Sequence, residues 1–82
     1  MKIYRLIDKY GWNETRTIKD AKRTAVSIAK NYGVTVRIER YNSDTKENEY
    51  LGTVHQPFID DNGRLHPAKF NRVNGKTENL GF

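Results

Sequence analysis

Residues 17–41, TIKDAKRTAVSIAKNYGVTVRIERY, decide the fold because a helical and a strand periodicity meet within them. Up to Tyr32 the apolar residues recur at helical spacing, and at about 100° per residue they fall within an arc of roughly 100°. Thr17 suits an N-cap with Asp20 three residues later, and Gly33 stands where helices commonly end in the left-handed conformation. The segment therefore predicts an amphipathic helix. Its apolar stripe comprises Ile18, Ala21, Ala25, Ile28, Ala29 and Tyr32.

The second half of this stretch, residues 34–41, alternates with the period of two that is typical of a half-buried strand. After a polar loop, residues 49–55 form a matching strand, so the two segments predict an antiparallel hairpin. Gly52 within the second strand indicates either a bulge or a place where something packs closely. We expect Val34, Val36 and Ile38 to point inward, and Thr35, Arg37, Glu39 and Tyr41 to point outward.

Before the helix, residues 2–8 carry apolar atoms on both faces, which favours a strand that is flanked by neighbours. A turn at residues 8–11 leads into residues 12–15, which we expect to return as a short second strand. Strands that precede and follow a helix are parallel and joined by a right-handed crossover if they share a sheet. We expect Trp12 to cap the core beside the helix N-terminus; if exposed, it would be a binding anchor.

Together these elements predict an α+β fold: a single small domain of β-α-β-β order, with one amphipathic helix packed on a mostly antiparallel sheet of three or four strands. Residues 1–55 form this core. Residues 56–82 form an irregular C-terminal segment of the same domain, either a peripheral hairpin packed by Phe58 and Phe70 or a partly flexible tail. We expect order over residues 56–73 and fraying after Gly75.

Composition bounds the class of protein. The 82 residues suffice for one domain, with 35% hydrophobic residues, 30% charged residues and no cysteine. Without cysteine there is no disulfide to supplement a modest core, which favours an intracellular chain. No apolar run approaches the roughly 20 residues that span a bilayer, and the N-terminus lacks the apolar stretch of a signal peptide. We expect a cytoplasmic protein with no membrane partner.

The positive charge is concentrated at the beginning of the chain. The net charge is +5 overall, and residues 1–33 alone carry +5, against −1 for residues 34–55 and +1 for residues 56–82. A basic face attracts polyanions, so this distribution favours nucleic acid or an acidic protein surface as the partner.

No constellation of residues indicates catalysis. Asp60 and Asp61 lie in a predicted turn, where aspartate commonly bonds its own backbone. His55 and His66 flank them with a spacing that is not diagnostic of a metal site. Neither a G-x-G-x-x-G nor a P-loop pattern occurs. We expect no enzymatic activity, no cofactor and no metal.

Two surfaces remain as candidate binding sites. The first is a basic ridge on the outer side of the helix, which could lie along a phosphate backbone or be an ordinary solvated face. It comprises Lys19, Lys22, Arg23 and Lys30.

The second surface is the outward face of the sheet. Arg37 and Tyr41 project from the best-defined strand, and Arg5 joins them, with Tyr4 and Tyr50 as further candidates. Aromatic and guanidinium groups on a sheet can stack on unpaired bases. The same residue types also suit a protein interface or simple cross-strand packing.

The helix and the strand that follows it resemble those of many small uncharacterised bacterial and phage domains, a similarity of amphipathic pattern that carries no functional motif. The Lys/Asn/Tyr-rich chain is also similar in style to small phage-encoded proteins that bind host machinery. We expect a small basic binding domain that contacts nucleic acid with little sequence preference, since no groove-reading motif is present. The alternative is a protein-interaction module, such as a phage or mobile-element factor that binds an acidic host protein surface.

Overall fold

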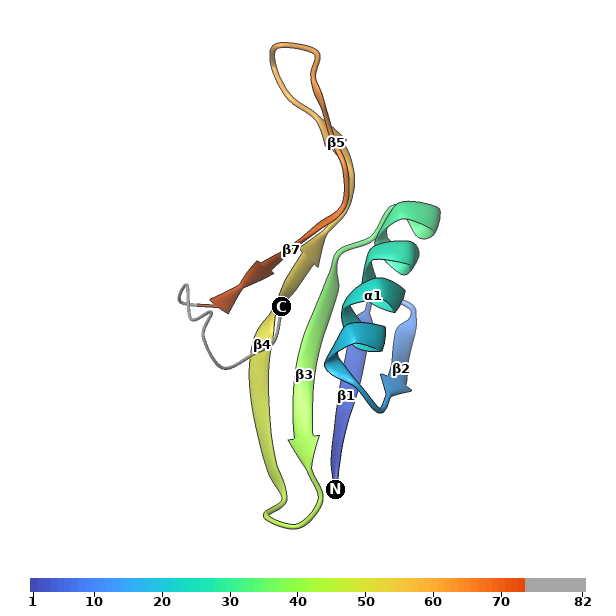
Figure 1. Cartoon of the computed structure of the whole chain (residues 1–82). Coiled ribbons are helices and arrows are strands. Elements are labelled where there is room, and N and C mark those ends of the chain that lie inside the picture. The colour runs from blue at the N-terminus through green and yellow to red at the C-terminus, as the bar shows by residue number, and fades with distance from the viewer. Residues whose placement is uncertain (74–82) are drawn as a thin grey trace.

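The computed structural model describes residues 1–73 and shows one helix lying on one face of a five-stranded antiparallel sheet, with a separate two-stranded hairpin (Figure 1). The strand order of the main sheet is β2-β1-β3-β4-β7. The α+β class and the β-α-β-β order are confirmed. The elements are β1 (Lys2–Asp8), β2 (Gly11–Thr15), α1 (Ile18–Tyr32), β3 (Val36–Asn42), β4 (Glu47–His55), β5 (Phe58–Ile59), β6 (Leu65–His66) and β7 (Lys69–Arg72).

The strands around the helix pair differently from a simple strand–helix–strand unit. β2 turns back beside β1 before the chain enters α1, and β3 then pairs on the other side of β1, antiparallel to it. β2 and β3 lie on either side of β1, so they run parallel to each other without touching. The return strand was predicted at residues 12–15, and its presence makes β1 a central strand with apolar atoms on both faces.

The ends of α1 follow the predicted capping chemistry. The Thr17 side chain accepts a hydrogen bond from the backbone N–H of Asp20 at 3.1 Å. At the other end Gly33 adopts φ 62° and donates its backbone N–H to the carbonyl of Ala29 at 3.0 Å. The absence of a Cβ makes this left-handed conformation inexpensive for glycine. The residues that begin and end the helix are thus set by local sequence.

Three alanines let α1 lie close against the sheet. Ala21, Ala25 and Ala29 are fully buried, whereas Ile18 and Ile28 pack at the margin of the core. Tyr32 was predicted on the same stripe, but its side chain is 68% exposed. The last turn of α1 stands beside a surface pocket rather than over a strand, so the prediction for Tyr32 is wrong. The largest fully buried side chains beneath the helix are those of Leu6, Val36, Ile38, Leu51 and Val54.

Gly52 is both a bulge position and a site of close packing, as its place in a strand predicted. The β3–β4 register shifts between Ile38 and Glu39. A Cβ built on Gly52 would lie 2.6 Å from the ring of Phe70 and nearer still to the backbone oxygen of Asn71. Only a residue without a side chain permits this approach, which lets β7 pair with β4.

The C-terminal segment is more regular than expected. β7 adds a fifth strand to the sheet, and Phe70 enters the core with 9% of its surface exposed. Between β4 and β7, residues 57–67 form a projecting hairpin, the arm, whose strands β5 and β6 pair only with each other among the described elements (Figure 1). The predicted fraying after Gly75 lies outside the described residues.

Candidate nucleic-acid interface

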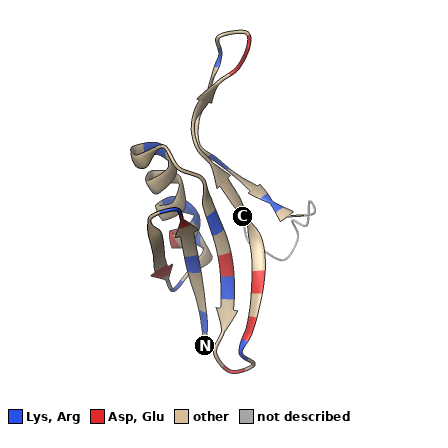
Figure 2. Ribbon diagram, turned by 180° about the vertical axis from the view of Figure 1, so that it is seen from behind, with Lys and Arg blue, Asp and Glu red and all other residues tan. Residues whose placement is uncertain are grey.

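The side of the main sheet away from α1 is covered by no element of residues 1–73, and we call it the open face (Figure 2). Strand alternation and register place the members of the open face. On β1 these members are Ile3, Arg5 and Ile7. On β2, Trp12 lies opposite Ile7 and Glu14 opposite Arg5. On β3, Arg37 lies opposite Ile7, Glu39 opposite Arg5 and Tyr41 opposite Ile3. On β4 the open face continues with Asn48, Tyr50, Thr53 and His55.

Arg5 lies between two aromatic rings of the open face. Its guanidinium carbon is 4.6 Å from the ring centre of Tyr41 and 5.5 Å from that of Trp12. Both distances fall within the range of a cation–π interaction. The Nε of Arg5 is buried and has no hydrogen-bond partner in the described part of the chain. The planar guanidinium thus lies between two rings of the open face.

A second cation–π pair joins β3 to β4. The guanidinium carbon of Arg37 lies 3.9 Å from the ring centre of Tyr50, whose hydroxyl is 2.5 Å from that of Thr53. Arg37 also donates from Nε to Glu39 at 2.5 Å. The open face therefore carries two arginine–aromatic stacks, Trp12–Arg5–Tyr41 and Arg37–Tyr50, on four adjacent strands.

Glu39 is a negative charge at the centre of the open face. A hydrogen bond from the Asn48 amide lowers the pKa of its carboxyl, and the hydrogen bond and charge of Arg37 and the charge of Arg5 lower it further, against an opposing effect of burial. Its side chain is 14% exposed. Glu39 is consequently ionised at neutral pH and offsets part of the positive charge of the two arginines.

Trp12 does not cap the core as predicted. It lies on the open face opposite Ile7 and is 59% exposed. The neighbouring Asn13 instead occupies the helix side of β2, opposite the buried Leu6. Because β2 is a short edge strand with polar or exposed residues on both faces, its sequence did not show which side would be buried.

The helix ridge, Lys19, Lys22, Arg23 and Lys30, is solvent-exposed on α1, on the opposite side of the sheet from the open face. Arg23 is paired with Asp20 at 2.6 Å, with both side chains largely accessible to water. The ridge is therefore a charged, solvated surface without aromatic groups among its members.

The structure thus divides the predicted site residues into two groups. It brings together Arg5, Arg37 and Tyr41 on the open face and leaves the helix ridge behind the sheet. Tyr50 joins the open face, as the sequence suggested, but Tyr4 faces the helix and is buried. Trp12, which was expected to cap the core and to be a binding anchor only if exposed, is exposed and also belongs to the open face.

The described residues contain no group of three or more histidine, cysteine or acidic side chains able to hold a metal ion. His66 Nε2 lies 2.7 Å from Asp60, and this pair serves the turn of the arm. Within residues 1–73, the single helix has neither the length nor the apolar character to cross a membrane.

Comparison with known proteins adds no identification. The chain matches no protein-family model, and no curated protein or solved structure shows significant similarity to it.

Proposed function

We propose that this chain is a small non-enzymatic binding domain that holds single-stranded nucleic acid on its open face, with little sequence preference. The observation that carries the proposal is the pair of arginine–aromatic stacks on an uncovered sheet. The rings belong to Trp12, Tyr41 and Tyr50, and the guanidiniums to Arg5 and Arg37.

This arrangement suits unpaired bases better than a duplex. Base–aromatic stacking contributes about 1–3 kcal/mol per base and accepts any base, because every base has a π-face. The two guanidiniums supply positive charge for the phosphates that lie between stacked bases. No described element presents a helix to a groove from this side of the sheet. The open face therefore favours strands whose bases are already exposed.

The helix ridge has a secondary role in this proposal. It lies behind the sheet, so one short strand cannot contact the ridge and the open face together without wrapping around the molecule. The ridge adds to the long-range attraction of polyanions and thereby raises the association rate.

Trp12 provides a direct test because it is the only tryptophan and is exposed. We expect oligothymidine and single-stranded RNA to quench its fluorescence, with weaker quenching by duplex DNA of the same length. Anisotropy of the labelled strand should give the same affinity, with a log–log salt slope of about −0.7 per phosphate contacted. Tyr41→Ala should weaken binding about tenfold, the loss expected for one stacked base.

The matched control reverses charge on the other surface. Lys19→Glu with Lys30→Glu should slow association but preserve the quenching of Trp12. If these variants abolish quenching while Tyr41→Ala does not, the ridge is the binding site and the proposal for the open face is wrong. If no nucleic acid binds at low salt, the proposal fails altogether, and the same arginine and aromatic residues would then indicate a protein interface.

A further inference from the structure

The arm exposes two aliphatic side chains that its own chain does not cover. Ile59 and Leu65 lie opposite each other in the β5–β6 register and are 69% and 68% exposed. A two-stranded hairpin is marginally stable on its own in water. The described arm is nevertheless regular, with its turn closed by bonds to Asp60 and its base by the stacked rings of Phe58 and His66, 4.6 Å apart. An ordered projection with an exposed aliphatic pair directly below its polar turn is suited to contact with a partner.

The charge of the arm indicates which partner. Residues 57–67 carry a net charge of −1, whereas the whole chain carries +5. An acidic projection is repelled by phosphate, so the arm is poorly suited to nucleic acid. It is attracted to basic protein surfaces, and a second copy of this chain is one.

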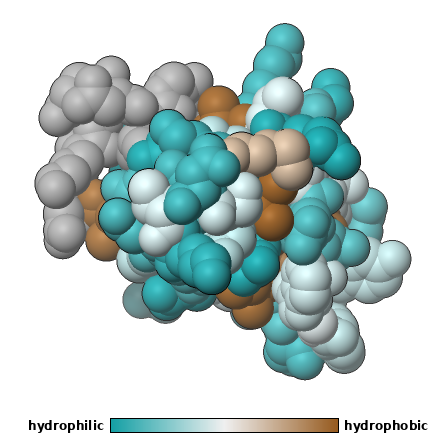
Figure 3. Space-filling model, turned by 90° about the horizontal axis from the view of Figure 1, so that it is seen from below, coloured by the Kyte–Doolittle hydropathy of each residue, from teal (hydrophilic) through white to brown (hydrophobic). Residues whose placement is uncertain are grey.

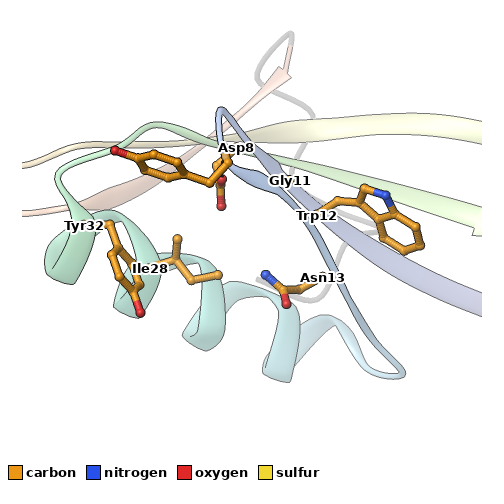
Figure 4. A pocket seen from close by; sticks show the side chains of 7 residues that line it. Asp8, Gly11, Trp12, Asn13, Ile28 and Tyr32 are labelled. Carbon is orange, nitrogen blue, oxygen red and sulfur yellow. Dashed lines mark hydrogen bonds between the residues drawn. The ribbon is translucent and has the colours of Figure 1, made fainter.

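A pocket that could receive Ile59 and Leu65 lies on the same molecule. It has a volume of about 470 Å³ and lies between the β1–β2 turn and the last turn of α1. Figure 4 shows Ile28 and Tyr32 on the helix side of this space, with Trp12 and Asn13 on the β2 side. Pockets of about 300–1,000 Å³ hold drug-sized molecules, so this one has room for two aliphatic side chains.

The rim of the pocket complements the charges of the arm. Lys9 Nζ lies 5.1 Å from the ring centre of Tyr10, which lines the pocket, and Asp8 lies within the pocket. Beside its aliphatic pair the arm exposes Asp61, opposite in charge to Lys9, and Arg64, opposite in charge to Asp8. Asp61 thus finds an opposite charge in Lys9 and Arg64 finds one in Asp8, while the carboxylate of Asp60 is bonded within the turn of the arm itself.

The arm and the pocket are placed so that two copies of the chain can each insert the arm into the pocket of the other. Both lie at the same end of the molecule, where the arm extends past the C-terminal end of α1 (Figure 1). A twofold axis at this end would place each arm beside the other copy's pocket, which gives a self-complementary interface. The opposite end, seen in Figure 3, is mostly hydrophilic, with hydrophobic residues visible only in small areas.

We propose that two copies of this chain form a symmetric dimer in which the arm of each, through Ile59 and Leu65, enters the pocket of the other beside Tyr32 and Ile28. Asp61 of one copy then lies near Lys9 of its partner. The inference goes beyond the proposed function, because it concerns a different surface and needs no nucleic acid.

Sedimentation equilibrium without nucleic acid tests the dimer. At low salt the mass should rise with concentration from 9.6 kDa towards twice that value. The exposed pair can be changed without disturbing the core, so Ile59→Ser with Leu65→Ser should fold normally and raise the dimer Kd about a hundredfold.

Charge reversal tests the orientation. Asp61→Lys and Lys9→Glu should each raise the dimer Kd about fivefold, and the two together should restore it. Glu47→Lys is the matched control: it makes the same charge change on an exposed residue at the opposite end and should leave the Kd unchanged. A chain that remains monomeric at every concentration overturns the proposal. The proposal also fails if the double serine variant dimerises as tightly as the wild type. It fails as well if the combined Asp61→Lys and Lys9→Glu variant does not recover the dimer Kd.

Discussion

At the scale of single residues, the open face depends on how Glu39 is held. Its carboxylate accepts from Asn48 at 2.5 Å and pairs with Arg37 at 2.5 Å, so it fixes the guanidinium that stacks on Tyr50. The same negative charge repels phosphate. Glu39 therefore organises the candidate site and at the same time limits its affinity for a polyanion.

Replacing Glu39 by glutamine separates these two effects. Glu39→Gln should lower the free energy of unfolding by roughly 1 kcal/mol at neutral pH, because charged hydrogen bonds to Asn48 and Arg37 are lost. It should also strengthen binding of single strands about threefold and steepen the log–log salt slope by about 0.7. Urea unfolding and oligothymidine titration measure the two quantities. Glu47→Gln, at an exposed site on the other side of the sheet, should change neither.

The effect of Glu39 on stability has a defined pH dependence. The pKa of its carboxyl in the folded chain is below the ordinary value of 4.5, so the ionised form stabilises the fold above that pH. This contribution is lost as the pH falls through the lowered pKa. The stability difference between wild type and Glu39→Gln should therefore vanish in acid, and a difference that persists there would contradict this account.

At the scale of elements, the arm is held by one aspartate rather than by a core. Asp60 accepts from the backbone N–H groups of Asn62 and Arg64 at 2.8 and 2.9 Å, and from His66 at 2.7 Å. Gly63 completes the turn with φ 78°, as the predicted Asp-Asn-Gly signal requires. The order of the arm is thus local, and it can be lost without unfolding the sheet.

Asp60→Ala should release the arm alone. We expect the amides of residues 58–66 to exchange with solvent about tenfold faster or more, while those of the main sheet keep their protection. Asn62→Ala, which removes a neighbouring side chain and keeps the backbone N–H that bonds Asp60, should leave the arm protected. Hydrogen exchange followed by NMR at low protein concentration distinguishes the two. Loss of protection in the main sheet would show that the arm is not an independent unit.

The arm should also respond to acid. The hydrogen bond from His66 and then that from the backbone of Arg64 lower the pKa of Asp60 below its ordinary 3.8, with a lesser contribution from the backbone of Asn62 and against an opposing effect of desolvation. The ionised carboxylate therefore stabilises the turn above that pH, and the stabilisation is lost as the pH falls through the lowered pKa. The same exchange experiment in acid should reproduce the Asp60→Ala result.

At the scale of the whole molecule, residues far along the chain complete the core. Phe70 on β7 packs over Gly52 of β4 and is almost fully buried, although it lies beyond the arm. The C-terminal segment therefore contributes to the cooperative unit, and the arm is an excursion within that unit rather than its end.

Two phenylalanines in this segment should behave differently. Phe70→Ala should lower the free energy of unfolding by about 3 kcal/mol or more, because it leaves a cavity beneath the sheet edge. Phe58→Ala, at the base of the arm and 46% exposed, should cost about 1 kcal/mol or less in the global transition. Urea denaturation compares them directly, and equal losses would place the arm inside the cooperative core.

Much of the fold followed from local patterns in the sequence. The helix, its caps, the β3–β4 hairpin and the inward positions Val36 and Ile38 were predicted because each depends on periodicity or capping within a few turns of chain. For the same reason Arg37 and Tyr41 were assigned to one outward face. These features need no knowledge of distant partners.

Tertiary structure decided the rest. The exposure of Trp12 depends on which face of an edge strand meets the helix, and the contact of Arg5 with Tyr41 depends on the β1–β3 register. The entry of Phe70 into the core requires β7 to pair with β4 across the whole arm. Periodicity is a property of neighbours in the chain, whereas these contacts join segments whose pairing is set by the burial of all the strands together, so only the folded molecule could show them.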